Sequence, residues 1–161
     1  MAGPQMIMFD QEFKQISAII ERLNHEANAK VCYLVDKNGQ LIASAGETAG
    51  IDSTSLASLT AGNIAATSGL AKLLGENEFS IVFHEGQRDN IHISLVGQRV
   101  ILVVIFDSRT SLGLVRLKVR KISNELADIF NSLAQKAQSS GSQKTPFEEI
   151  TDQDIDKLFS D

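Results

Sequence analysis

Tryptophan is absent from the sequence, and cysteine and proline are nearly so: the 161 residues include no Trp, one Cys and two Pro. The single thiol, Cys32, excludes a scaffold held by disulfides within the chain and favours a reducing compartment. A surplus of basic charge is also missing, because the net charge is −5, so a surface for nucleic acid is not expected. No apolar run approaches the roughly 20 residues that span a bilayer. We therefore expect a soluble, cytoplasmic protein without membrane insertion.

Catalytic groupings are missing as well. The three histidines share no ligand-like spacing, and although His84 and His92 could face each other across a hairpin, they lack the Cys or carboxylate support of a zinc site. No GxxxxGK[ST] motif is present, so the chain is not itself a P-loop GTPase. We expect neither an enzyme nor a metal or cofactor of its own. Cys32, inside the apolar run KVCYLVD, is interpreted as an inert packing residue.

Apolar residues at steps of three and four predict three helices. The first begins at a candidate N-cap, Asp10, and the third begins near Ser111. The second is capped by Asp52 or Ser53 and runs to about residue 74, where Gly75 closes it. The stripes of the first and third helices are Phe13, Ile16, Ile20, Leu23 and Ala27, and Val115, Val119, Ile122, Leu126, Ile129 and Leu133.

Five segments have the composition of strands: KVCYLVD, QLIASA, EFSIVFH, NIHISLV and RVILVVIF. Asn38-Gly39, between the first two, predicts a type I′ turn. The resulting order, α-β-β-α-β-β-β-α, indicates an α/β (α+β) sandwich with one antiparallel sheet of about five strands, two helices on one face and the second helix on the other. The strand EFSIVFH follows the crossover helix, so we expect it at a sheet edge, where it has no Pro or Lys to block pairing with another chain.

The second predicted helix carries a small-residue stripe at four-residue spacing: Ala57, Ala61, Ala65 and Gly69, next to Ser58, Ser68 and Lys72. Small side chains let a second backbone come close. A contact of this kind would offset the loss of helix stability at Gly69, which is about 1 kcal/mol relative to Ala in a helix interior. The residues alone leave open whether the stripe meets a partner or the chain's own fold. The leucines of this helix are expected to face the sheet: Leu56, Leu59, Leu70 and Leu74.

The C-terminal part divides into a flexible linker, 139–146, and a docking segment, 147–161, that follow a domain spanning 1–138. The docking segment contains a short amphipathic helix of about two turns, too short to be stable alone in water. Docking on another protein is the favoured interpretation, and folding back onto the chain's own domain is the alternative. The apolar residues concerned are Phe147, Ile150, Ile155, Leu158 and Phe159.

The element order, together with LVDKNGQLIASAG and LASLTAGNIAATSGLAKLLG, resembles the roadblock (dynein light chain) family over about residues 9–138. GLAKLLGENEF, DSRTSLGLVRLKV and the ending ITDQDIDKLFSD are similar to bacterial members that partner a Ras-like GTPase, MglA, in cell polarity and gliding motility. The resemblance implies a roadblock/profilin-like fold and a homodimer whose second helices pair and whose edge strands join. One GTPase would sit across two protomers.

The same resemblance implies that the dimer stimulates GTP hydrolysis by repositioning the GTPase's own catalytic residues, without an arginine finger. GTP, GDP and Mg²⁺ would belong to the GTPase, the docking segment would modulate nucleotide exchange, and the protein could be enriched at a cell pole. Two alternatives remain open: an architectural roadblock scaffold without effect on GTP turnover, and a small-molecule sensor.

Residue roles also follow from the resemblance. The expected GTPase-binding residues are Ala61, Ala65, Gly69 and Lys72, and the expected dimer contacts are Ala57, Ser58, Ser68, Phe79, Ile81 and Phe83. Arg109 lies in a predicted loop, where GTPase activators often carry a transition-state arginine. For Arg109 we expect instead a structural role at the start of the third helix, or a surface contact.

Overall fold

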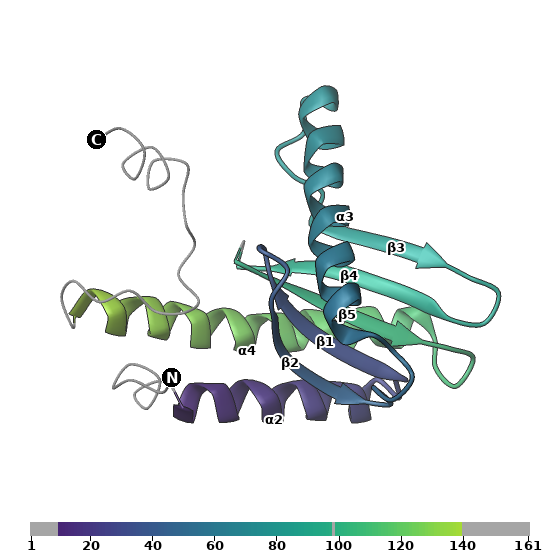
Figure 1. Ribbon diagram of the computed structural model, residues 1–161, viewed down its shortest axis with the longest axis horizontal. Helices are drawn as coiled ribbons and strands as arrows, with labels where there is room; N and C mark the ends of the chain where they lie inside the picture. The colour runs from purple at the N-terminus through teal and green to yellow at the C-terminus, as the bar shows by residue number, and fades with distance from the viewer. Residues whose placement is uncertain (1–9, 98, 140–161) are drawn as a thin grey trace.

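The computed structural model describes residues 10–97 and 99–139. The described elements have the predicted order, α-β-β-α-β-β-β-α (Figure 1). The helices are α2 (Asp10–Glu26), α3 (Ser53–Leu74) and α4 (Leu112–Ser139). The strands are β1 (Val31–Asp36), β2 (Leu41–Gly46), β3 (Ile81–Glu85), β4 (Asn90–Val96) and β5 (Val100–Phe106).

The strands form one antiparallel sheet in the order β2-β1-β5-β4-β3. β5 lies at the centre and is buried at every position, which explains its uninterrupted apolar sequence, VILVVIF. β3 lies at one edge, as predicted, and pairs only with β4 among the described residues. It begins at Ile81 rather than at Glu78, because the chain leaving α3 first runs back along that helix (Figure 1).

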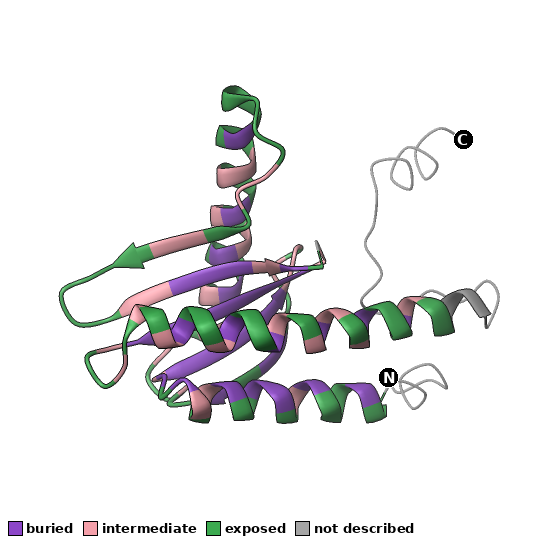
Figure 2. Cartoon of the chain, turned by 180° about the vertical axis from the view of Figure 1, so that it is seen from behind, coloured by how far each residue is buried: buried purple, intermediate pink, exposed green. Residues whose placement is uncertain are grey.

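Helices cover both faces of the sheet in the predicted arrangement. α2 and α4 lie side by side on one face (Figure 2), and α3 crosses the other (Figure 1). Among the described residues, three ion pairs join α2 to α4: Glu12 with Lys136, Arg22 with Glu125, and Glu26 with Lys118, the last at 3.8 Å. The larger core cluster lies under α2 and α4, and the smaller cluster lies under α3.

The stripes predicted for α2 and α4 are buried, except at Phe13 of α2 and Ile129 of α4. Phe13 is 42% exposed, whereas Glu12, on the neighbouring side of α2, is buried and paired with Lys136. The buried surface of α2 is therefore turned slightly from the predicted one. In α4, Phe130 joins the buried stripe and Ile129 is only partly buried.

The β1–β2 turn is not the predicted type I′ turn. A type I′ turn requires positive φ at both central residues, but only Gly39 has it, at 90°. The Asp36 carboxylate accepts hydrogen bonds from the backbone N–H groups of Asn38 and Gln40, both at 2.9 Å, and the Gly39 N–H donates to the Asp36 carbonyl. Side-chain capping by Asp36 therefore selects a longer connection with a single left-handed residue.

Candidate functional site: a protein-binding surface on α3

The ends of α3 are set by its capping residues, as the sequence predicts. The Asp52 carboxylate accepts hydrogen bonds from the Ser55 N–H, at 3.1 Å, and from the Ser55 hydroxyl, at 2.8 Å. These bonds lower the pKa of Asp52 and satisfy a backbone donor of the first turn. Gly75 ends the helix with φ of 75°, and its N–H points to the Ala71 and Lys72 carbonyls.

The side of α3 that packs on the sheet is not the leucine side. Its buried residues are Ala57, Thr60, Ile64 and Ala71. The prediction that the leucines face the sheet is wrong for Leu59, Leu70 and Leu74, which are 73%, 58% and 70% exposed. The physical reason for Leu70 and Leu74 is visible in Figure 1, because the second half of α3 projects beyond the sheet. Leu59 lies in the first half of α3, where its side chain lines a groove between the helix and the sheet instead of packing on the strands.

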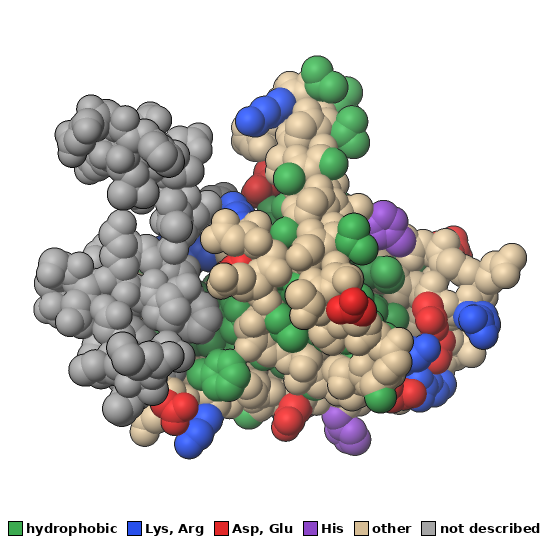
Figure 3. Space-filling model, in the orientation of Figure 1, with side chains coloured by type: hydrophobic (Ala, Val, Ile, Leu, Met, Phe, Trp, Pro, Cys, Tyr) green, Lys and Arg blue, Asp and Glu red, His purple; other side chains and the backbone are tan. Residues whose placement is uncertain are grey.

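A leucine seam runs along one exposed flank of α3. We define it as the residues that alternate at steps of three and four: Leu56, Leu59, Asn63, Ala66, Leu70 and Leu73. This is the a/d spacing of a helix that packs along a second helix. Leu73 is 84% exposed, and Figure 3 shows hydrophobic side chains along this flank and at the free end of α3. The sequence already shows this spacing, but it does not show that the seam is exposed.

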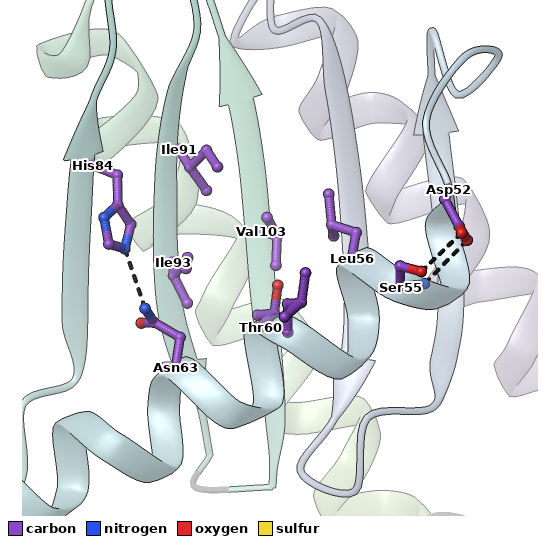
Figure 4. A pocket seen from close by; sticks show the side chains of 10 residues that line it. Asp52, Ser55, Leu56, Thr60, Asn63, His84, Ile91, Ile93 and Val103 are labelled. Carbon is purple, nitrogen blue, oxygen red and sulfur yellow. Dashed lines mark hydrogen bonds between the residues drawn. The ribbon is translucent and has the colours of Figure 1, made fainter.

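A groove of about 540 Å³ separates the seam from the outer strands of the sheet. Its floor is apolar, with Ile91, Ile93 and Val103 on β4 and β5 (Figure 4). At its β3 side, Asn63 and His84 point toward each other, with Asn63 Nδ2 3.5 Å from His84 Nε2. The other amide atom of Asn63, Oδ1, is buried and has no hydrogen-bond partner. The groove is thus an apolar surface with one unsatisfied polar group.

The small-residue stripe lies on the opposite flank of α3, toward the β1–β2 turn. The two flanks are roughly 150° apart around the helix axis, at 3.6 residues per turn. Gly39 of that turn approaches α3 closely, because a Cβ at this position would lie 3.3 Å from the Ser58 Cα. Of the predicted GTPase-binding residues, Ala65, Gly69 and Lys72 are exposed and Ala61 is partly buried. A Cβ on Gly69 would meet nothing within 4 Å.

The predicted dimer contacts do not share one surface. Ala57 is buried against the chain's own sheet, so its side chain is not part of any exposed surface. Ser58 and Ser68 belong to the flank with the small-residue stripe. Ile81 is 49% exposed on the β3 edge, and Phe83 stacks on Phe106 with ring centroids 6.0 Å apart.

Arg109 is held by carboxylates. Its guanidinium donates to Asp107, at 2.9 and 3.0 Å, and to Glu47, at 3.0 Å, and its carbonyl accepts from Asn28 at 2.8 Å. These hydrogen bonds raise the pKa of Arg109 and lower that of Asp107. Because Nε and Nη2 of Arg109 link the β5–α4 loop to the end of β2, the arrangement supports a structural role.

His84 and His92 do not face each other across the β3–β4 hairpin. In the β3–β4 register His84 pairs with Ile91 and His92 pairs with Phe83, so the two rings lie on opposite faces of the sheet. His92 is buried on the α4 side without a hydrogen-bond partner, and burial, followed by the charge of Arg116, lowers its pKa. No cluster of potential metal ligands occurs among the residues that the structure describes.

Cys32 is fully buried, and desolvation raises the pKa of its thiol to about 12. This confirms the interpretation of Cys32 as a packing residue, because the reactive thiolate is strongly disfavoured.

Across 10–97 and 99–139, no helix is long and apolar enough to cross a membrane. The linker beyond Ser139 and the docking segment, with Phe147, Ile150, Ile155, Leu158 and Phe159, lie outside the described residues.

Comparison with known proteins gives consistent matches. The profile of the Roadblock/LC7 domain matches residues 16–106. Myxococcus xanthus MglB is 66% identical, with a TM-score of 0.74, over 76% of this chain and 92% of its own. The gliding protein MglB from Thermus thermophilus is 30% identical, with a TM-score of 0.71, over 82% of this chain and 95% of its own.

A Roadblock/LC7 domain from Streptomyces avermitilis, 12% identical with a TM-score of 0.65 over 71% of this chain and 97% of its own, shares the fold. The comparison with curated proteins found no match. The matches to solved structures confirm the resemblance and the roadblock/profilin-like fold that the sequence motifs predict.

Proposed function

Since this chain belongs to the Roadblock/LC7 domain family and is of the MglB type within it, we propose that it is a homodimeric GTPase-activating protein for a small Ras-like GTPase of the MglA type. It regulates its partner without catalytic groups of its own. In this proposal it is cytoplasmic, serves cell polarity and gliding motility, and is enriched at a cell pole. GTP, GDP and Mg²⁺ belong to the GTPase.

The observation that carries the homodimer is the leucine seam beside an unpaired sheet edge. Leu59, Leu70 and Leu73 are mostly exposed, and β3, which among the described residues pairs only with β4, borders the groove that Leu59 lines. A second copy placed against this side would cover the leucines with its own α3 and pair its β3 with the first. The leucine seam and the β3 edge favour the same dimer, because both border the same groove.

The GTPase is assigned to the other exposed flank of α3. Ala61, Ala65 and Gly69 present almost no side chain there, so the backbone of a partner can approach closely, and Lys72 supplies a cation at the end of the stripe. In the dimer two such flanks lie on one side of a continuous sheet, which suits one GTPase seated across two protomers. Docking against the partner's switch regions is the contact that the proposal requires.

The proposed mechanism is a population shift. The dimer binds the hydrolysis-competent arrangement of the GTPase more tightly than the resting one, so the GTPase's own catalytic residues are held in position. Arg109 is not a finger in this scheme, because Asp107 and Glu47 already bind Nε and Nη2 of its guanidinium. The docking segment, 147–161, adds a tethered contact with an effective concentration on the order of millimolar, and it modulates nucleotide exchange.

Phosphate release from the GTP-loaded, Mg²⁺-bound GTPase, measured with and without the full chain, tests the proposal. Stimulation by the parent chain is expected to disappear in Ala65→Arg, because a long side chain separates the two backbones. Arg109→Ala is the control and should still stimulate. Absence of stimulation by the parent, with binding retained, would leave the architectural scaffold as the function. Loss of stimulation in Arg109→Ala with binding intact would restore the arginine finger.

A further inference from the structure

The leucine seam is a palindrome. About a point midway between Ile64 and Ala65, Leu56 mirrors Leu73 and Leu59 mirrors Leu70. The central pair of the seam is Asn63 and its mirror position, Ala66. An interface related by a twofold axis must be self-complementary, and a palindromic seam has that property for two antiparallel helices. A second copy is therefore the occupant that the seam itself specifies.

In an antiparallel α3 pair centred on that point, leucine meets leucine toward both ends and the two Asn63 side chains flank the axis. Their Cα atoms would be offset by about 4.5 Å along the helices, at 1.5 Å per residue. A side-chain amide bridges such an offset. The pairing therefore brings the only amide of the seam next to its own copy.

The state of the Asn63 amide matches this placement. One end contacts His84 at 3.5 Å, and the other end, Oδ1, is buried without a partner. An amide nitrogen has two hydrogens, so Nδ2 can serve His84 and one further acceptor. Oδ1 has almost no exposed surface in the single chain, so the amide must turn slightly to bring Oδ1 to the interface. Two copies can then exchange a reciprocal pair of bonds, Nδ2–H of each to Oδ1 of the other. That pair satisfies the atom that the single chain leaves unsatisfied.

We propose that Asn63 sets the register and the self-selectivity of the α3–α3 contact through this reciprocal amide pair. The proposal rests on the homodimer of the proposed function and goes beyond it. A single polar residue in an apolar helix seam selects the one alignment in which it finds a partner, at some cost in affinity. A different chain with an apolar residue at this position would leave the amide buried and unpaired, which disfavours the mixed pair roughly 10- to 100-fold.

Cysteine cross-linking in a Cys32→Ser background reads out the register. Mixing Leu59→Cys chains with Leu70→Cys chains should give the mixed disulfide dimer, because these positions face each other in the proposed register. Mixing Ala66→Cys with Leu70→Cys should give little, because those positions meet only after a shift of one heptad. With Asn63→Leu added, the shifted product is expected to appear while the affinity of the dimer stays equal or rises.

The preference of the parent chain for its own copy is measured by mixing tagged parent chains with untagged Asn63→Leu chains in equal amounts. Mixed dimers should form at less than one-fifth of the level expected for random pairing. Ala65→Leu adds the same side chain on the other exposed flank of α3 and should mix randomly with the parent.

The outcomes separate the two proposals. A parent chain that sediments as a monomer would remove the homodimer itself. A parent dimer without the Leu59→Cys to Leu70→Cys product would show that the register is wrong. A dimer with that product, in which Asn63→Leu neither shifts the register nor avoids the parent, would overturn the role of Asn63 alone.

Discussion

Replacing Leu59 and Leu70 together with alanine should separate the chain into monomers without unfolding it. The two side chains are 73% and 58% exposed in the single chain, so they contribute little to its own core. In the proposed dimer each is covered by the mirror-related leucine of the other protomer. The double variant therefore removes four leucine side chains from the interface while leaving both folded protomers almost unchanged.

The expected magnitude follows from the exposed fractions. Complete burial of a leucine side chain contributes about 1.5–3 kcal/mol. Scaled by the exposed fractions of Leu59 and Leu70 and counted in both protomers, the four side chains contribute about 4–8 kcal/mol. Alanine retains one of the four side-chain carbons, so we expect a loss of about 3–6 kcal/mol. That loss weakens the dimer roughly 10²- to 10⁴-fold in Kd.

Sedimentation equilibrium over a wide range of chain concentrations measures this change directly. The matched control is Leu117→Ala, because Leu117 is 61% exposed on α4, on the other face of the sheet (Figure 2). The control should dimerise as the parent does, and thermal melts should show both variants folded. A double variant that dimerises as tightly as the parent would refute the assignment of the seam to self-association.

Three further predictions concern the fold. Between pH 7 and pH 5 the free energy of unfolding should fall, because burial lowers the pKa of folded His92 while the unfolded histidine titrates near about 6.5 and takes up the proton. His92→Leu should flatten that slope in urea titrations, and an unchanged slope would exclude His92 as its source. Gly46→Ala should lower stability by several kcal/mol and Gly50→Ala by only about 1 kcal/mol in thermal melts. Both glycines have positive φ, but only at Gly46 would a Cβ clash, 2.5 Å from the Lys30 carbonyl oxygen, and equal losses would contradict this. Iodoacetamide at pH 8 should label Cys32 only in urea, because its pKa is about 12 and it is buried, so rapid labelling of the native chain would disprove its inertness.

Much of this fold can be predicted from the sequence, because it depends on interactions between residues close together along the chain. Asp52 and Gly75 mark the ends of α3 correctly, because a carboxylate that caps backbone N–H groups and a glycine that adopts φ of 75° act within a few residues of themselves. The buried stripe of α4 follows from its spacing in the same way. The edge position of β3 was predictable too, since a strand that follows a crossover helix enters the sheet from outside.

The candidate site was only half predictable. Periodicity separated the leucines of α3 from its small residues, and the roadblock resemblance predicted that this helix contacts other chains. The exposed position of Leu59 and Leu70 could not be read from periodicity, because a repeating pattern tells which residues share a face and not what that face meets.

By itself, the sequence determined the order of the elements, the helix ends and the family. These depend on neighbours along the chain. Tertiary structure decided which side of α3 packs on the sheet, because the helix extends past the strands and leaves Leu70, Leu73 and Leu74 without a surface to cover. It also decided the faces of His84 and His92, since a difference of one residue in strand register turns a side chain to the opposite face of the sheet.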